Sequence, residues 1–145
     1  MSRAVDVALD GVRIPVSRAR VADVATAVLK AEKVAHALLS IAFVSRERIA
    51  ALNREHLGHI GATDVISFAF VRATDTDPVI GDIYICADVA RAAAKERRIG
   101  VRDELTRLVI HGTLHVLGYD HPDAEGREQS PMWKRQEQLL ARVSR

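Results

Sequence analysis

Apolar and polar side chains alternate near the start of the chain, and this alternation predicts strands. In residues 5–9 and again in residues 12–16, apolar side chains stand at every second position, as they do in half-buried strands. The Asp10-Gly11 pair between the two runs marks a turn. We therefore expect a hairpin, with its second run at a sheet edge because Pro15 has no N–H for a ladder hydrogen bond.

Further along the chain, apolar residues recur three or four positions apart and predict five helices. Ser45, Asp88 and Ser130 are expected to cap helices, and Gly58, Gly100 and Gly118 to end them. The expected helices begin at Ser17 and then cover about 46–57, 89–99, 102–117 and 131–143.

Runs rich in β-branched and aromatic residues at 64–71 and 79–86 predict two more strands, joined as an antiparallel hairpin by a short loop with Pro78. Strand 39–44, helix 46–57 and strand 64–71 would form a βαβ unit with a parallel pair of strands. The expected fold is α+β: a single domain over residues 1–145, with a small mixed sheet (the βαβ unit plus the hairpin) covered by about five helices.

Composition narrows the class of protein. A chain of 145 residues buries roughly two-thirds of its unfolded surface, so a metal is not needed to hold its core. The lone Cys86, the acidic residues in the first ten positions and the lack of an apolar run of about 18 residues favour a cytoplasmic protein without a membrane span. The formal net charge of +2 permits a polyanionic partner, but an ordinary solvated surface explains it equally well.

The run VIHGTLHVLGYDH, residues 109–121, indicates a metal site on a buried helix. His111 and His115 are four apart, so their rings lie on one helix face, and the turn at Gly118 would bring back His121 as a third ligand. Three histidines suit Zn²⁺ and leave a coordination position open, as in catalytic sites. A structural zinc is the weaker alternative, because such sites are usually four-coordinate and rich in cysteine; Cys86 is expected to pack rather than to bind metal.

The same spacing occurs in metzincin proteases, where a glutamate directly after the first histidine accepts a proton from water. Here that position is Gly112, which has no side chain to accept a proton, so we do not expect peptide cleavage by that route. Glycine is disfavoured inside a helix, so Gly112 suggests the close approach of another backbone or of substrate. Asp120 and Asp123 flank the third histidine and could hold an imidazole N–H, although a solvated turn would look the same.

With HGTLHVLGYDH, TDVISF (63–68), GDIYI (81–85), and Met132 and Glu137 in the last helix, the chain resembles the YbeY family. This resemblance implies a zinc-dependent endoribonuclease with one Zn²⁺ on the three histidines. Its substrate would be single-stranded RNA, and its partners rRNA and the ribosomal small subunit. The implied role is maturation of the 3′ end of small-subunit rRNA and ribosome quality control.

The remaining functional residues are less well defined by the sequence. The family often carries an arginine where this chain has Leu57; Arg54 and His59 are nearby replacements for its positive charge or for proton transfer. Beyond a water molecule on the zinc, no catalytic group is assigned, and either that water or the RNA 2′-OH could attack. Arg54, Arg98 and Arg102 are candidate RNA contacts, or else parts of a solvated surface. A ribosome-assembly factor with little cleavage and a zinc hydrolase acting on another substrate are the alternative functions.

Overall fold

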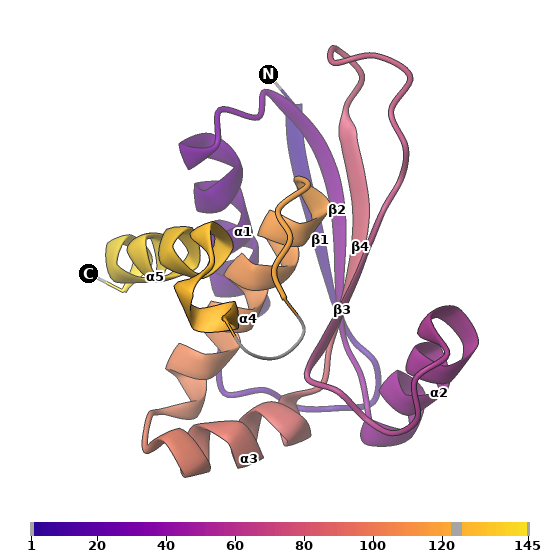
Figure 1. The fold of residues 1–145 in the computed structure, drawn as a ribbon, viewed down its shortest axis with the longest axis vertical. Helices are drawn as coiled ribbons and strands as arrows, with labels where there is room; N and C mark the ends of the chain where they lie inside the picture. Colours follow the sequence, from indigo (N-terminus) through magenta and orange to yellow (C-terminus); the bar gives the residue numbers. More distant parts are fainter. Residues whose placement is uncertain (1, 123–125, 145) are drawn as a thin grey trace.

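A four-stranded mixed sheet organises the computed structural model, which describes residues 2–122 and 126–144. The strand order is β1-β2-β4-β3, so β3 lies at one edge (Figure 1). β1, β2 and β4 are parallel, whereas β3 runs antiparallel to β4. The strands are β1 (Ser2–Leu9), β2 (His36–Phe43), β3 (Val65–Ala69) and β4 (Val79–Ile85).

The sheet has a βαβ unit, but this unit is formed by β1, α1 (Arg18–Ala31) and β2 rather than by residues 39–71. The predicted N-terminal hairpin is wrong, because β1 pairs in parallel with β2 and residues 12–16 form no strand. Pro15 lacks the N–H that a strand partner would need. The apolar side chains of residues 12–16 instead pack against the edge of the core on the way into α1.

The predicted parallel pairing of strand 39–44 with strand 64–71 is also wrong. β4 lies between β2 and β3, and β3 joins the sheet only through its antiparallel pairing with β4, as the predicted hairpin requires. Every second residue of β4 is buried, including Ile83 and Ile85, which suits a central strand. β3 is shorter and only partly buried. Because it is the last strand in the order, its far edge pairs with no other described strand.

The five predicted helices are present. They are α1, α2 (Arg46–Leu57), α3 (Ala87–Arg97), α4 (Val101–Val116) and α5 (Pro131–Val143), with a short 3₁₀ helix, η1 (Arg127–Gln129), before the last. Ser45 and Ser130 cap α2 and α5 as expected. Asp88 does not cap α3: this helix starts after Cys86, and Asp88 pairs with Arg91 at 2.9 Å. It ends at Arg98 in the left-handed conformation rather than at Gly100.

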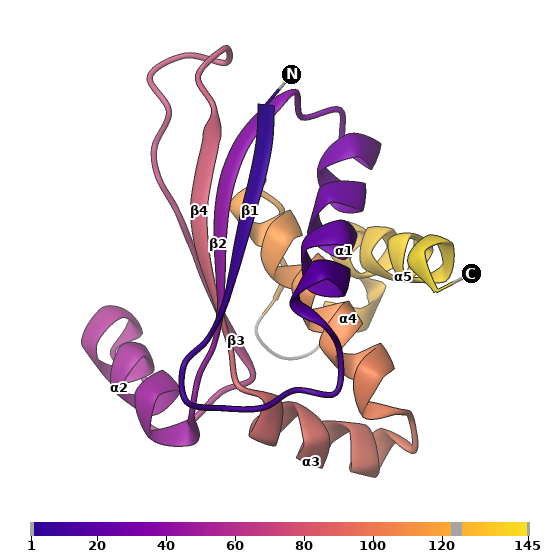
Figure 2. The same ribbon diagram turned by 180° about the vertical axis from the view of Figure 1, so that it is seen from behind.

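α1 and α4 cover one face of the sheet, α5 packs on these two helices from outside, and α2 lies on the other side of the sheet (Figures 1 and 2). α4 approaches the sheet closely because glycines stand at both sides of the contact. A Cβ on Gly112 would lie 2.7 Å from Ile83 Cγ2, and a Cβ on Gly81 would lie 2.5 Å from Val116 Cγ1. This close packing holds α4 against β3 and β4. Among the described residues, no helix has the length and apolar character to cross a membrane.

Candidate metal centre

The three histidines of the sequence motif converge at the C-terminal half of α4. His111 and His115 project from the helix, and His121 returns to them after the turn at Gly118, whose φ is 101°. The Nε2 atom of His121 lies 3.1 Å from that of His115 and 3.1 Å from that of His111. Zn–N bonds of about 2.0–2.1 Å in a tetrahedron place two nitrogens about 3.3 Å apart. The arrangement of the three rings therefore fits a metal ion.

The other ring nitrogens define the tautomers. His115 Nδ1 lies 3.0 Å from the carbonyl oxygen of Tyr119, and His121 Nδ1 lies 2.8 Å from that of Pro122. A carbonyl oxygen only accepts hydrogen bonds, so each Nδ1 carries the proton and donates it. Each Nε2 then presents a lone pair to the other rings. Such converging lone pairs repel one another unless a cation lies between them.

Gln136 orients the third ring from α5. Its Oε1 lies 2.6 Å from His111 Nδ1, and its Nε2 donates to Glu137 Oε2 at 3.1 Å. Because a carboxylate only accepts, the bond to Glu137 fixes which end of the amide faces the histidine. Glu137 is held in turn by two 3.0 Å bonds from Arg107. A candidate metal ligand on α4 is thus positioned by a hydrogen-bonded chain that starts on α5 and returns to α4.

Burial favours the neutral form of His111 and His115. It lowers the pKa of His111 to about 3, against the raising effect of the Gln136 hydrogen bond. It also lowers the pKa of His115, with a further lowering by the nearby His121. Protons therefore compete weakly for these nitrogens, and the lone pairs are available to a cation.

A hollow of about 450 Å³ opens over the three rings, between β3, the loop before it and η1. Leu57 lines this hollow, but Arg54 and His59 are exposed and are not among the described lining residues. Neither therefore places a positive charge or proton-transfer group in the hollow.

The other two candidate RNA contacts lie far from the histidines. Arg98 ends α3, and Arg102 lies in the first turn of α4, about two and a half turns before His111. Arg102 donates to the carbonyl oxygen of Pro15 at 2.9 Å. As RNA contacts, both stay predictions.

The residues expected around the metal ligands have other surroundings. Asp120 Oδ1 accepts a 2.9 Å hydrogen bond from the backbone N–H of His121 rather than from an imidazole ring, and so shapes the turn. Asp123 lies outside the described residues. Cys86 is buried in the apolar cluster beneath α2, which agrees with a packing role.

Gly112 faces the sheet. A Cβ at this position would meet the side chains of Ile83 and Ser67, and Ser67 Oγ donates to the carbonyl oxygen of Gly112 at 3.2 Å. The glycine does mark a close approach, but sheet side chains make it, rather than the backbone or substrate that was expected.

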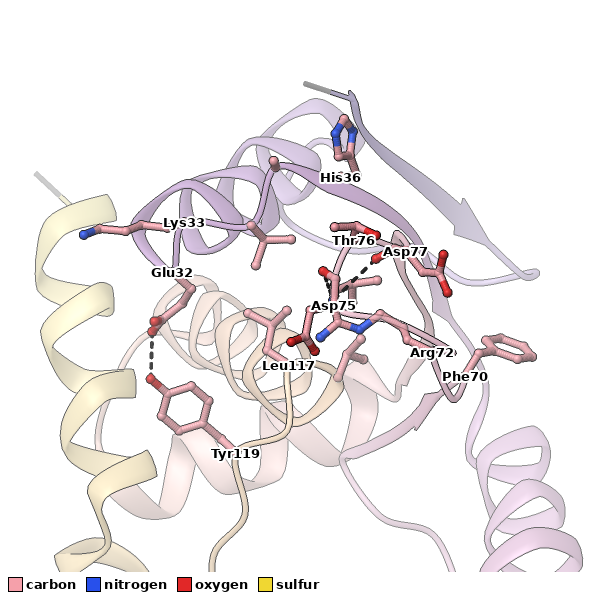
Figure 3. A pocket seen from close by; sticks show the side chains of 14 residues that line it. Glu32, Lys33, His36, Phe70, Arg72, Asp75, Thr76, Asp77, Leu117 and Tyr119 are labelled. Atoms are coloured by element: carbon pink, nitrogen blue, oxygen red, sulfur yellow. Dashed lines mark hydrogen bonds between the residues drawn. The ribbon is translucent and has the colours of Figure 1, made fainter.

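A larger hollow of about 570 Å³ lies beyond the C-terminal end of α4, lined by the β3–β4 loop, the end of α1 and the start of β2 (Figure 3). Tyr119 connects this hollow to the metal centre by hydrogen bonds. The hydroxyl of Tyr119 donates to Glu32 in its wall at 3.1 Å, while the carbonyl oxygen of Tyr119 accepts from His115. Among the described residues, the side chains that line this hollow do not form a cluster of three that could hold one metal ion.

Two residues at the site were not singled out by the sequence, namely Gln136 and Arg127. Gln136 lies on the buried face of α5 together with the apolar residues Met132 and Leu139. Arg127 lies in η1 and lines the hollow with the histidines. Neither belongs to a motif with its own spacing, so only the tertiary structure brings them to the metal centre.

Comparison with known proteins agrees with this geometry. The sequence profile of the family described as Endoribonuclease YbeY matches residues 11–144. Endoribonuclease YbeY of Frankia casuarinae is 40% identical over 137 residues, covering 87% of this chain and 67% of that protein. Endoribonuclease YbeY of Staphylococcus carnosus is 40% identical over 108 residues, covering 70% of this chain and 69% of its own.

The fold also has a counterpart among solved structures. The solution structure of TM1509 from Thermotoga maritima superposes with a TM-score of 0.62 and covers 96% of this chain and 88% of its own, at 22% sequence identity. At that identity the likeness concerns the fold alone.

Proposed function

Because the chain belongs to the Endoribonuclease YbeY family, we propose that it is a zinc-dependent endoribonuclease that cuts single-stranded RNA. Its proposed role is maturation of the 3′ end of small-subunit rRNA and ribosome quality control. That role implies contact with the ribosomal small subunit and a cytoplasmic location. One Zn²⁺ per chain is proposed, held by His111, His115 and His121.

The observation that carries this proposal is the convergence of three imidazole nitrogens within 4.8 Å of one another, with each Nδ1–H already engaged. An imidazole that binds a metal does so in its neutral form, so an ion held by three histidines would keep its full charge. Three protein ligands also leave a tetrahedral position for substrate or water. This pattern supports a catalytic rather than a structural metal.

Zinc at this position would supply an acidified water molecule and a positive charge for a developing phosphoryl oxyanion. The chain supplies the orientation. Gln136 and the carbonyl oxygens of Tyr119 and Pro122 hold the three rings in one tautomer. The open edge of β3 and the side chain of Leu57 bound the hollow into which the scissile phosphate would enter.

The same geometry argues against a peptidase. Residue 112, where a metzincin carries its general base, is a glycine that packs on Ile83 and Ser67 in the sheet. A phosphodiester with an adjacent 2′-OH already contains a nucleophile, so its cleavage needs less from the protein at this position.

The test is a labelled single-stranded RNA incubated with metal-loaded protein, beside the same protein with a chelator and beside His115→Ala. We expect cleavage by the loaded wild type alone, with duplex RNA spared because a paired strand enters the hollow less readily. His115→Ala should bind metal poorly yet fold normally by circular dichroism, since the apolar core does not use the ion.

Three outcomes would contradict the proposal. Equal cleavage by wild type and His115→Ala would indicate a contaminating nuclease. Stoichiometric metal in a triple alanine variant of the histidines would refute the ligand assignment. An inactive wild type that still associates with ribosomal subunits, and remains inactive in their presence, would favour an assembly factor.

A further inference from the structure

Arg127 lies beside the three histidines and gives their hollow its positive charge. It is the first residue of η1, which follows the segment after His121 and leads into α5. Among the described residues that line the hollow, Arg127 is the one lysine or arginine, and Asp64 is the one carboxylate. The permanent positive charge of Arg127 therefore lies in the same hollow as the three proposed ligands of the zinc ion.

The guanidinium of Arg127 is incompletely satisfied within the protein. Its Nε is buried and has no hydrogen-bond partner in the part of the chain that the structure describes. Buried donors are rarely left unpaired, because each costs the desolvation of the group without a compensating bond. Because Arg127 also lines the hollow, an acceptor that enters there could bond to its guanidinium group.

Arg127 lines the same hollow as the three histidine rings. Its positive charge therefore opposes a divalent cation at their Nε2 atoms. Two positive groups lining one hollow are stable together when an anion lies between them.

We propose that Arg127 binds a non-bridging oxygen of the scissile phosphodiester, so that the phosphate lies between the guanidinium and the three-histidine centre. This inference rests on the proposed function for the identity of the anion. Arginine suits the task because its planar fork donates two parallel bonds to a phosphate. It fills the role that the sequence suggested for Arg54 and His59, which are not among the described residues lining the hollow.

The experiment compares Arg127→Met, which keeps the length of the side chain without its charge, with Arg127→Lys, which keeps the charge without the fork. Arg48→Met serves as the matched control, because Arg48 is an exposed cation near the start of α2, away from the hollow. Each purified full-length variant is first checked for folding by circular dichroism. Two affinities are then measured: that for Zn²⁺, by competition with a chelator, and that of the zinc-loaded protein for a single-stranded oligodeoxynucleotide, which lacks the 2′-OH.

The two affinities should move in opposite directions in Arg127→Met. Loss of a like charge should tighten zinc binding several-fold, while loss of the phosphate contact weakens oligodeoxynucleotide binding by about tenfold. Arg127→Lys should keep the wild-type zinc affinity and recover part of the oligonucleotide affinity. Arg48→Met should change neither. With RNA as substrate, we expect kcat of Arg127→Met to fall at least tenfold.

The inference fails if Arg127→Met weakens both affinities together, which would show a structural role for Arg127, or if Arg48→Met weakens oligonucleotide binding equally. Failure of the proposed function looks different. If the wild type does not cut RNA but the two affinities still move in opposite directions in Arg127→Met, the phosphate contact stands and the nuclease assignment falls.

Discussion

A buried histidine ring makes the metal-free protein sensitive to acid. His111 is 4% exposed, and its pKa in the folded chain is about 3, well below the ordinary 6.5. The unfolded chain therefore takes up this proton more readily than the folded one. The stability that depends on neutral His111 is complete above about pH 6.5 and is lost as the pH falls towards 3.

We expect the free energy of unfolding of the metal-free protein to fall by up to about 1.4 kcal/mol per pH unit below pH 6.5 on account of this residue. Urea denaturation at pH 7, 6 and 5 measures the slope. His111→Gln serves as the comparison, because it removes the titrating group. Equal slopes for both proteins over this range would contradict the assignment.

Gln136 is a second residue whose side chain acts through a histidine. It is 1% exposed and hydrogen-bonded to both His111 and Glu137. Gln136→Leu would leave the Nδ1–H of His111 without its acceptor and free the ring to turn. We expect zinc affinity to fall roughly 10- to 100-fold, as is usual when the hydrogen-bond partner of a metal ligand is lost. The matched control is Gln138→Leu, on the exposed side of the same helix, which should bind zinc like the wild type in chelator competition.

At the scale of elements, the contact between α4 and the sheet depends on residues without side chains. A Cβ on Gly112 would lie 2.7 Å from Ile83 Cγ2, and Ile83 is fully buried. α4 must therefore move outward, or Ile83 must repack, when a side chain is added at position 112. Because His111 and His115 lie on the same helix, such a movement also changes their position relative to β3.

We expect Gly112→Ala to lower the free energy of unfolding by about 1–3 kcal/mol, as overpacking usually does, even though alanine favours helix over glycine. Gly112→Glu should be worse, since it places a carboxylate in the apolar interface, and it should impair RNA cleavage without creating peptidase activity. Thermal unfolding and a peptide-hydrolysis assay measure the two effects. Peptide hydrolysis by Gly112→Glu would show that our orientation of residue 112 is wrong.

The elements themselves could be predicted from periodicity, but their pairing could not. Alternation in residues 5–9 predicts a strand but does not say which strand it pairs with. β1 pairs in parallel with β2, 34 positions later in the chain at Ser2↔His36, and not with residues 12–16. The order of β3 and β4 likewise depends on which strand buries more apolar surface. Helix ends were predictable where a serine side chain caps the helix, as at Ser45, and less so at α3, which starts without a side-chain cap.

At the scale of the whole molecule, the metal centre divides into a local part and a distant part. The three ligands lie within eleven residues, so helix geometry and one glycine turn were enough to predict their convergence. Gln136 and Arg127 reach the same point only because η1 and α5 fold back onto α4. A side chain that meets its partner through tertiary packing leaves no spacing in the sequence by which to find it.

The division of the ligands between a helix and the segment after it has a dynamic consequence. His111 and His115 belong to a packed helix, whereas His121 follows it beyond Gly118. An ion shared by all three cross-links this segment to the helix. We expect zinc to slow amide hydrogen exchange at residues 119–121 while leaving the interior of α4 unchanged. Exchange measured by mass spectrometry, with His115→Ala as the control, tests this. Equal exchange with and without zinc would contradict this expectation. If zinc does slow the exchange, the exchange rate of residues 119–121 reports how much of the protein carries metal.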